Sequence, residues 1–312
     1  MSARAVTWRI GCSALVLALL SGCASPPAPT SVPEKIAAQP RAPHELRVMT
    51  FNLRVRTVVD GHNIWDKRRD LVVERVRDFD PDLLGTQEGL DSMEIYLQQR
   101  LGDYTFLGVG RNDGKLGGEM CGIFFKTARF TLLNSGHFWL STSPETPGSR
   151  AWGELFPRLV MWVKLRPREV GRDFYWFNTH FDAFRGRARE ESARLFRERI
   201  AEIAGAAPCV VTGDFNSSPG SAPYRTLLEP QRPPMSSLHD VFRDAHPVVS
   251  RADGTVHFFT GWRGGQHMDW ILASAQFQTI NADIDHTRGA TGYPSDHFPV
   301  TATLRARFPA AQ

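Results

Sequence analysis

The chain has 312 residues, of which 42% are hydrophobic and 22% charged, and its formal net charge is +4. This is ordinary globular composition, with enough length for one large hydrophobic core or two small ones. A small positive net charge of this kind does not indicate a nucleic-acid-binding protein, because such proteins usually carry a concentrated basic patch.

The first 22 residues have the pattern of a signal peptide. Arg4 and Arg9 form a charged start, and residues 10–20 are almost entirely apolar, a stretch too short to span a bilayer. Leu20-Ser21-Gly22-Cys23 follows and resembles the lipobox of bacterial lipoproteins. The resemblance implies cleavage before Cys23 and lipidation of that cysteine. The alternative is an ordinary signal peptide followed by a chance cysteine.

Residues 23–44 are interpreted as a proline-rich tether. They show no apolar periodicity, and they contain Pro26, Pro27, Pro29, Pro33, Pro40 and Pro43. In polyproline geometry, at ~3.1 Å per residue, such a segment reaches roughly 60 Å. Ala24 follows Cys23, and in the enterobacterial sorting rule a residue other than Asp there favours the outer membrane. We therefore expect a lipid-anchored protein of a Gram-negative cell envelope, at the outer membrane and facing the periplasm.

Composition is even from residue 45 to residue 308, without a second linker or a repeat, which predicts one domain. Eight runs rich in β-branched and aromatic residues, bounded by Gly, Pro, Asn and Asp, are predicted strands. They span residues 46–53, 83–87, 121–126, 158–165, 174–179, 209–212, 270–273 and 298–304. Cys121 and Cys209 lie in two of these runs, and we expect buried free thiols there rather than a disulfide.

Apolar residues at helical spacing predict three helices. The first lies around residues 65–79, the second repeats at every fourth residue over 93–101, and the third covers 188–203. Gly205 supplies a natural stop for the third helix. Strands outnumber helices and the two do not alternate regularly. This favours a sheet-rich α/β sandwich over a simple doubly wound fold.

Polar side chains stand where the predicted strands end or begin. A strand end holds its backbone rigidly while the side chain projects toward loops, as precise ligand geometry requires. Any one of these residues alone is more simply a strand terminator, because Asn, Asp and Gly are common there. Six such places in one chain, with carboxylates and two histidines among them, indicate a functional site.

Six motifs at these places carry a resemblance to a known family. In chain order they are Met49-Thr50-Phe51-Asn52, Gly85-Thr86-Gln87-Glu88, Asn178-Thr179-His180-Phe181-Asp182, Thr212-Gly213-Asp214-Phe215-Asn216, Met268-Asp269-Trp270-Ile271 and Ser295-Asp296-His297-Phe298-Pro299-Val300. This order resembles that of the endonuclease/exonuclease/phosphatase superfamily, with its deoxyribonuclease-I-like fold. The resemblance implies a four-layer α/β sandwich, in which two packed, mainly antiparallel β-sheets are flanked by helices. It also implies a metal-dependent phosphoesterase.

The resemblance implies a role for each polar residue. Glu88 and Asp296 would bind Mg²⁺ (or Mn²⁺), with Asn52 beside the metal, and Asp269 would orient the imidazole of His297. Glu88 and Asp296 supply the hard anionic oxygens that Mg²⁺ prefers. The metal would polarise a phosphoryl oxygen and screen the charge that repels a nucleophile.

Two mechanisms stay open at this point. In one, the His297–Asp269 pair is the general base for water and His180 protonates the leaving oxygen. In the other, Asp214 activates the water and His297 stabilises the charge that develops on the phosphoryl group. Asn216 would orient the nucleophile or bind the phosphate in either mechanism. Both use a histidine, whose ordinary pKa near neutrality suits proton transfer.

The sequence also predicts the surroundings of three further residues. Arg54 stands two positions after Asn52, where abasic-site endonucleases have an acid, so a second metal ligand is not expected there. Arg111 begins a Gly-rich stretch and is expected at the rim of the cleft, where arginine suits bidentate phosphate binding. A solvated turn is the alternative for that stretch. His267 is expected to be an exposed histidine at a strand end.

Three substrate classes remain. A nucleic acid is disfavoured because basic residues alternate with acids, as in residues 185–199, and no basic–aromatic platform is visible. A phospholipid headgroup would suit a lipid-anchored protein, but Phe258-Phe259 is the only candidate for an aromatic hairpin that enters a bilayer. A phosphorylated small molecule remains by elimination, and no protein partner is evident. The rival interpretation is a non-catalytic ligand-binding lipoprotein that retains the fold.

Overall fold

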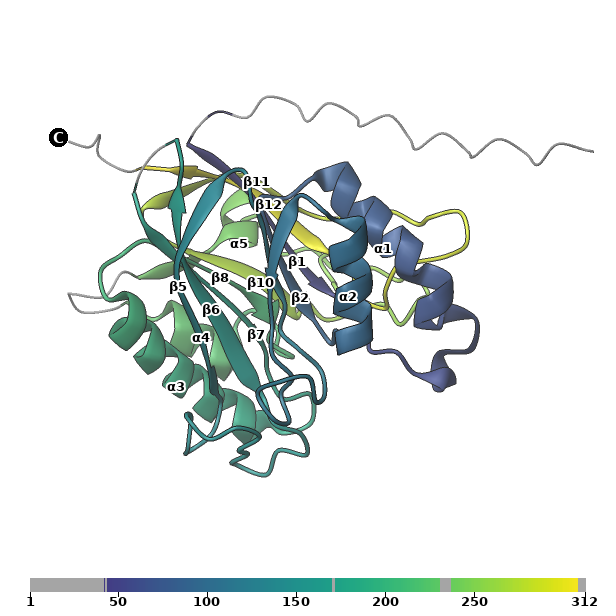
Figure 1. The fold of residues 1–312 in the computed structure, drawn as a ribbon, viewed down its shortest axis with the longest axis horizontal. Helices are drawn as coiled ribbons and strands as arrows, with labels where there is room; N and C mark the ends of the chain where they lie inside the picture. The colour runs from purple at the N-terminus through teal and green to yellow at the C-terminus, as the bar shows by residue number, and fades with distance from the viewer. Residues whose placement is uncertain (1–41, 43, 170–171, 231–236, 308–312) are drawn as a thin grey trace, which may run out of the picture. The chain divides into compact units, whose positions relative to one another are not determined.

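A computed structural model of the chain, shown in Figure 1, describes residues 42, 44–169, 172–230 and 237–307. The predicted signal peptide, Cys23 and nearly all of the predicted tether lie outside these residues, as does the predicted domain end at residue 308. These assignments stay predictions. Within the described ranges, no helix is both long enough and apolar enough to cross a membrane.

The first β-sheet has six strands in the order β11-β12-β1-β2-β4-β3. Its strands are β1 (Glu45–Asn52), β2 (Leu83–Gln87), β3 (Tyr104–Leu107), β4 (Ile123–Lys126), β11 (Phe277–Ile284) and β12 (Val300–Ala306). β1 pairs in parallel with β2 and antiparallel with β12. β1 and β2 are central strands with both faces covered, so nearly all of their residues are buried.

The second β-sheet also has six strands, in the order β5-β6-β7-β8-β10-β9. Its strands are β5 (Phe130–Trp139), β6 (Leu159–Pro167), β7 (Phe174–His180), β8 (Cys209–Asp214), β9 (Leu238–Asp240) and β10 (Asp269–Ser274). β7 and β8 are parallel, whereas the other strand pairs named in this sheet are antiparallel. The predicted architecture of two mainly antiparallel sheets is confirmed.

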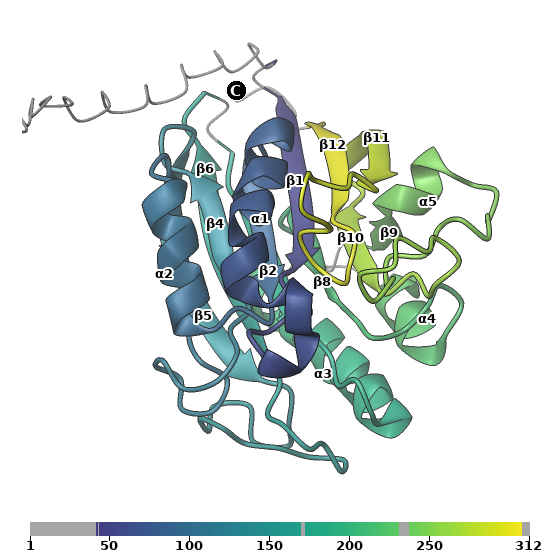
Figure 2. The same cartoon turned by 90° about the vertical axis from the view of Figure 1, so that its right-hand side faces the viewer.

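Helices cover the outer face of each sheet (Figures 1 and 2). α1 (Trp65–Phe79) and α2 (Asp91–Arg100) pack on the first sheet, and α3 (Gly186–Ala204) and α4 (Ala222–Leu228) lie on the second. A short helix, α5 (Val241–Ala245), lies beside β11, and a kinked 3-10 segment, η1 (Val58–Asn63), precedes α1. The two sheets and their helices form the four predicted layers.

Three apolar clusters stabilise these layers. The largest fills the space between the sheets, and the other two lie between each sheet and its helices. Phe215 stacks on Trp270 with ring centroids 4.3 Å apart, in the cluster beneath α3 and α4. Burying one large apolar side chain contributes about 1.5–3 kcal/mol to folding, so these clusters dominate the stability. Cys121 and Cys209 are buried free thiols, as predicted.

A fully buried polar cluster joins the two sheets near the ends of their parallel strands. Gln87 donates from Nε2 to Oδ1 of Asn178 at 2.8 Å, and Thr212 donates to the same oxygen at 3.0 Å. Nδ2 of Asn178 donates to the carbonyls of Thr86 and Gly122. Because these side chains have no exposed surface, their hydrogen bonds fix how the sheets meet.

The eight predicted strands and three predicted helices are all present, with ends shifted by one or two residues. Four strands were not predicted: β3, β5, β9 and β11. They are the four strands at the edges of the two sheets. Edge strands carry exposed polar residues, and β5 and β11 each contain a bulge that interrupts the alternation of buried and exposed residues.

Candidate active site

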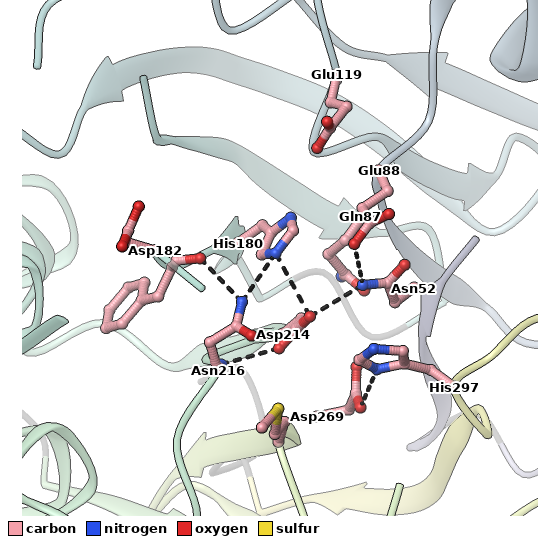
Figure 3. A network of polar contacts seen from close by, with 12 residues as sticks. Asn52, Gln87, Glu88, Glu119, His180, Asp182, Asp214, Asn216, Asp269 and His297 are labelled. Carbon is pink, nitrogen blue, oxygen red and sulfur yellow. Dashed lines mark hydrogen bonds and ion pairs between the residues drawn. The ribbon is translucent and has the colours of Figure 1, made fainter. Parts of the chain in front are cut away.

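Strand topology brings the predicted site residues to one end of the sandwich. β1 and β2 run in parallel, so Asn52 and Glu88 lie at the same edge of the first sheet. In the second sheet His180 pairs with Asp214 across the parallel strands, and Asp269 pairs with Asp214 across the antiparallel strand β10. Figure 3 shows these side chains converging from both sheets.

The loop before β12 completes this group. Ser295 donates from Oγ to the carbonyl of Asn52 at 2.6 Å, which ties the loop to the end of β1. The carbonyl of Asp296 accepts the backbone N–H groups of His257 and Phe258. These bonds hold Asp296 and His297 against the strand ends, so the eight predicted catalytic and metal-binding residues lie together.

Asn52 bridges two carboxylates of the site. Its Nδ2 donates to Oε1 of Glu88 at 3.0 Å and to Oδ2 of Asp214 at 2.9 Å. Its Oδ1 accepts the backbone N–H of Arg54 at 2.8 Å. Asn52 thus presents its nitrogen, and not its oxygen, to the acids. The predicted role of Asn52 at the metal stays a prediction.

His297 and Asp269 form a buried pair. Nδ1 of His297 lies 2.8 Å from Oδ2 of Asp269. Burial alone disfavours the imidazolium, but the charge of Asp269, the hydrogen bond to it and the charge of Asp214 outweigh that effect. Together they raise the pKa of His297 well above its ordinary value. His297 is therefore protonated at neutral pH, with Nε2–H free to donate.

Asp214 is placed to exchange a proton near neutrality. Burial raises the pKa of Asp214 to about 7, and the neighbouring charge of Asp269 acts in the same direction. The backbone N–H of Asn216 donates to its Oδ1 at 2.9 Å. A carboxylate with a pKa close to the working pH is suited to general base catalysis.

His180 has the opposite electrostatic environment to His297. Burial lowers the pKa of His180 well below its ordinary value, and the positive charges of Arg158 and Arg111 add to this effect. Nδ2 of Asn216 lies 3.0 Å from Nε2 of His180 and also donates to the carbonyl of Phe181. An amide nitrogen only donates, so Nε2 of His180 accepts and the ring is neutral.

Backbone strain is concentrated at the site. Among described residues other than glycine, seven have a positive φ, and these include Arg54 at 55°, Glu88 at 61° and Asn216 at 47°. Residues with side chains pay a steric cost in this region, which persists where surrounding contacts enforce it. At Glu88, bonds from Asn52 and from the backbone N–H of Val55 to the two carboxylate oxygens supply that enforcement.

The donor atoms fit a hard divalent cation. Asp296 is buried, and burial raises the pKa of its carboxyl group, with the charge of Glu88 acting in the same direction. Ligand atoms of Glu88, His180 and Asp214 lie within 4.8 Å of one another. Two carboxylates in such a group repel each other unless a cation compensates them, and carboxylate oxygens are the ligands that Mg²⁺ and Mn²⁺ prefer.

Arg111 is buried, which corrects its expected place on an exposed rim. It is 8% exposed, and its two terminal nitrogens each lie 2.7 Å from an oxygen of Glu119. Together with Arg158 and His180, this ion pair lines a small cavity of about 10 Å³, which has room for about one water molecule. Arg111 therefore reaches the site from inside the cavity, and its role in substrate binding stays a prediction.

The sequence analysis missed Arg158. This residue is 4% exposed, and its Nε and Nη1 have no hydrogen-bond partner among the described residues. Its Nε lies 3.9 Å from Oδ2 of the buried Asp182, so the two charges offset each other, while the unused N–H groups could still donate to an anionic ligand beside His180. Arg158 opens a predicted strand, and a charged residue at the start of an apolar run was the available signal.

His267 was expected to be exposed, and this was wrong. It is 5% exposed and lies against Phe242, with ring centroids 4.8 Å apart. α5 covers the start of β10 at this point, and the sequence analysis had not predicted this helix. Neither ring nitrogen has a hydrogen-bond partner among the described residues, and burial lowers the pKa of His267.

Comparison with known proteins identifies the family of this chain. Residues 49–297 match the model of the endonuclease/exonuclease/phosphatase family. The chain belongs to this family. The match begins in β1 and ends at His297, so it contains every predicted catalytic and metal-binding residue.

Two solved structures of family members are similar throughout the domain. A family protein of Bacteroides vulgatus has a TM-score of 0.78 and 32% identity, and the alignment covers 84% of this chain and 99% of that one. A mannosyl-6-phosphatase of Bacteroides thetaiotaomicron has a TM-score of 0.74 and 29% identity, with 83% and 99% covered.

Curated relatives are more distant. Nocturnin of Rattus norvegicus is 26% identical over 289 residues, which cover 81% of this chain and 63% of that protein. Nocturnin of Drosophila melanogaster is 25% identical over 221 residues, covering 62% of this chain and 32% of that protein. The chain thus spans less than two thirds of the length of these relatives.

Proposed function

We propose that this protein hydrolyses phosphate esters with the help of a divalent cation. One observation carries the proposal: the partly buried Glu88 and the buried Asp214 offer ligand atoms within 4.8 Å of one another, together with His180, and the buried Asp296 and His297–Asp269 pair belong to the same site. A non-catalytic protein has no need to retain so costly a group of buried charges. The family contains enzymes of this class, which supports the same conclusion.

Glu88 and Asp296 would hold Mg²⁺ or Mn²⁺, which, when bound, polarises the phosphoryl group and screens its negative charge. Asn52 keeps Glu88 and Asp214 at a fixed separation through its two N–H···O bonds. Hydrogen bonds that already hold the carboxylates in place reduce the movement these side chains must make when the substrate reacts.

The electrostatics favour one of the two mechanisms that the sequence left open. Asp214, with its pKa of about 7, takes the proton from the attacking water. His297, held as the imidazolium by Asp269, donates from Nε2 to the phosphoryl oxygens as negative charge develops on them. His180 is neutral at this pH, so it positions Asn216 and the phosphate instead of protonating the leaving group.

A phosphorylated small molecule is the substrate class that we propose. Arg158 and Arg111 place two guanidinium groups beside His180, and their positive charge favours a compact anionic group such as a phosphate. The similar Bacteroides thetaiotaomicron protein is named a mannosyl-6-phosphatase, which supports a sugar phosphate monoester. Nucleic acid and phospholipid headgroups are the competing classes to test.

The test is hydrolysis by the full-length chain, purified in detergent, with Mg²⁺, with Mn²⁺ or with chelator. The substrates are mannose 6-phosphate, p-nitrophenyl phosphate, bis-p-nitrophenyl phosphate, plasmid DNA and sphingomyelin. We expect metal-dependent release of phosphate from the monoesters, lost in His297→Ala and retained in His44→Ala, which changes an exposed histidine outside the site. Absence of turnover on every substrate, with a metal bound, would instead favour a non-catalytic ligand-binding lipoprotein.

We also propose that lipid on Cys23 anchors the enzyme to the cell envelope, at the outer membrane and facing the periplasm. The support is the signal-peptide pattern and the Leu20-Ser21-Gly22-Cys23 lipobox. Labelled palmitate should be incorporated into the wild-type chain and not into Cys23→Ser. Incorporation into both chains would contradict this assignment.

A further inference from the structure

Thr255 contacts both of the segments that carry the His297–Asp269 pair. It lies in the loop between α5 and β10 and has no exposed surface. Its hydroxyl accepts the backbone N–H of Met268 at 2.9 Å and that of Asp269 at 3.3 Å. The same hydroxyl donates to the carbonyl of Gln266 at 3.4 Å. A hydroxyl has one donor and two acceptor positions, so the hydrogen-bonding capacity of this group is fully used.

The start of β10 needs this hydroxyl because the neighbouring strand is short. β8 pairs with β10 from Asp269 onward, whereas β9 pairs with it only from Leu272 to Ser274. On the side where β9 does not reach, the hydroxyl of Thr255 accepts the N–H groups that a longer strand would accept. The first residue of β10 is therefore fixed by a side chain and not by a strand.

The backbone of Thr255 fixes the other member of the pair. Its carbonyl accepts the N–H of Phe298 at 2.7 Å, and the N–H of His257 donates to the carbonyl of Asp296 at 2.8 Å. These two bonds form an antiparallel bridge around His297. The backbone of His297 is thus held on both sides by the segment that contains Thr255.

The carboxylate of Asp269 depends on how its backbone is held. Its Oδ2 lies 2.8 Å from Nδ1 of His297, as Figure 3 shows, and its Oδ1 has no hydrogen-bond partner among the described residues. Because the ring is its one side-chain partner, the carboxylate is not fixed independently of His297. The register between the two backbones therefore decides whether the two groups meet.

The same contacts reach the proposed general base. The carbonyl of Met268 accepts the N–H of Phe215 at 2.8 Å, and Phe215 follows Asp214 directly in the chain. Asp269 also pairs with Asp214 across β8 and β10. The hydroxyl of Thr255 is therefore one end of a chain of backbone bonds that runs to the segment of Asp214.

Close backbone approach keeps Thr255 in place. A Cβ at Gly265 would lie 2.0 Å from the carbonyl oxygen of Val256, and one at Gly254 would lie 2.5 Å from backbone atoms of Gly265. The N–H of Gly254 donates to the carbonyl of Arg263 at 2.9 Å. Only glycine permits backbones to approach so closely, so the segment on either side of Thr255 has little room to shift.

We propose that Thr255 is a positioning residue for the reaction: its hydroxyl and its carbonyl set the register between Asp269 and His297. Thr255 acts through the backbone and not by touching the substrate. A displacement of about 1 Å at a reacting group costs up to about a hundredfold in rate, so loss of this register should lower kcat. The inference deepens the proposed function, on which it rests, because it concerns the same site.

Thr255→Val tests the hydroxyl, because valine keeps the shape of threonine without the hydrogen bonds. In hydrolysis of p-nitrophenyl phosphate by the full-length chain in detergent with Mg²⁺, kcat should fall about ten- to hundredfold at unchanged KM. Thr255→Ser restores the hydroxyl and should restore kcat. Thr301→Val is the matched control, because it removes a buried hydroxyl of β12 that donates to the carbonyl of Asp283. It should leave both constants unchanged.

A second measurement does not depend on hydrolysis. The proton that Nδ1 of His297 donates to Asp269 should give a low-field proton magnetic resonance signal that is absent from His297→Ala. This signal should be the same in wild type and Thr255→Ser, and it should be shifted or lost in Thr255→Val. An unchanged signal in Thr255→Val, or equal losses of kcat in Thr255→Val and Thr255→Ser, would overturn the inference.

Thr255→Cys covers the case in which Thr255→Val does not fold. A thiol accepts hydrogen bonds only weakly, so kcat should fall and the His297 signal should shift, both by less than in a chain without the hydroxyl. Wild-type values of both in Thr255→Cys would overturn the inference. A wild type that hydrolyses no ester, with a signal that still shifts on loss of the Thr255 hydroxyl, would refute only the proposed function.

Discussion

Nδ1 of His297 lies 2.8 Å from Oδ2 of Asp269, and this contact joins the first residue of β10 to the loop that precedes β12. Asp269 in turn pairs with Asp214 across the second sheet. The bond thus couples the charge of the imidazolium to the carboxylate that would activate water. The pH dependence of catalysis should report this coupling.

Asp269→Asn should shift the alkaline limb of kcat/KM to lower pH. The carboxylate raises the pKa of His297 in wild type, so the imidazolium persists well above pH 7 and activity is lost only as pH rises through that pKa. Without the negative charge the pKa falls, and the protonated form is lost earlier. A pH profile of phosphate release measures the shift, and an unmoved alkaline limb would contradict this role for Asp269.

Asp214→Asn should remove the general base. We expect kcat to fall by about 10²–10⁴, the usual contribution of general base catalysis. In wild type, activity should rise with pH through about 7, as Asp214 loses its proton. This acid limb should be absent from the residual activity of Asp214→Asn. If His180 or His297 were the base, the limb would remain in this variant.

The same substitution should stabilise the fold. Because the folded pKa of Asp214 is raised to about 7, the native state binds this proton more tightly than the unfolded chain does. Stability therefore falls as pH rises from about 4 to 7, and the loss remains at higher pH. A neutral Asn carries no buried charge at any pH. The free energy of unfolding of Asp214→Asn, measured in urea, should therefore exceed that of wild type by about 1–3 kcal/mol at pH 8 and by little at pH 4. Equal free energies of unfolding for wild type and Asp214→Asn at pH 8 would contradict a destabilising buried charge on Asp214.

Asn178→Ala should destabilise the junction between the sheets. Gln87, Thr212 and two backbone carbonyls would each lose one hydrogen bond in a region without solvent. Leaving buried polar groups unpaired costs about 1–3 kcal/mol each, so a loss of about 2–5 kcal/mol is expected in urea unfolding. Asn134→Ala, at an exposed position of β5, should change stability by less than about 0.5 kcal/mol. Similar losses in both variants would contradict this assignment.

The sequence predicted the central strands because both of their faces are buried. The run ending at Asn52 and the run ending at Gln87 are rich in large apolar residues, and each ends in a polar residue near the site. Edge strands such as β5 and β11 have bulges and exposed residues, so their local sequence resembles that of loops. Strand prediction therefore succeeded at the centre of each sheet and failed at its edges.

The identities of the site residues were predictable from the sequence, but their hydrogen bonds and protonation states were not. Asn52 was predicted to lie at the metal, but its hydrogen bonds from the amide nitrogen to Glu88 and Asp214 were not predictable from the sequence. The opposite protonation of His180 and His297 depends on charges that come from distant segments, Arg158 for one and Asp269 for the other. Such couplings arise only when the sheets pack, so local patterns do not contain them.

The most direct test compares wild type with Glu88→Gln, an isosteric change that removes one charge from the proposed metal ligands. Phosphate release from mannose 6-phosphate and p-nitrophenyl phosphate should be followed while Mg²⁺ is titrated, with calorimetry on the same samples. We predict turnover that requires Mg²⁺ in wild type, and at least about a hundredfold loss of both metal affinity and kcat/KM in Glu88→Gln. Turnover that persists in chelator, or is unaffected by Glu88→Gln, would contradict metal-dependent hydrolysis at this site.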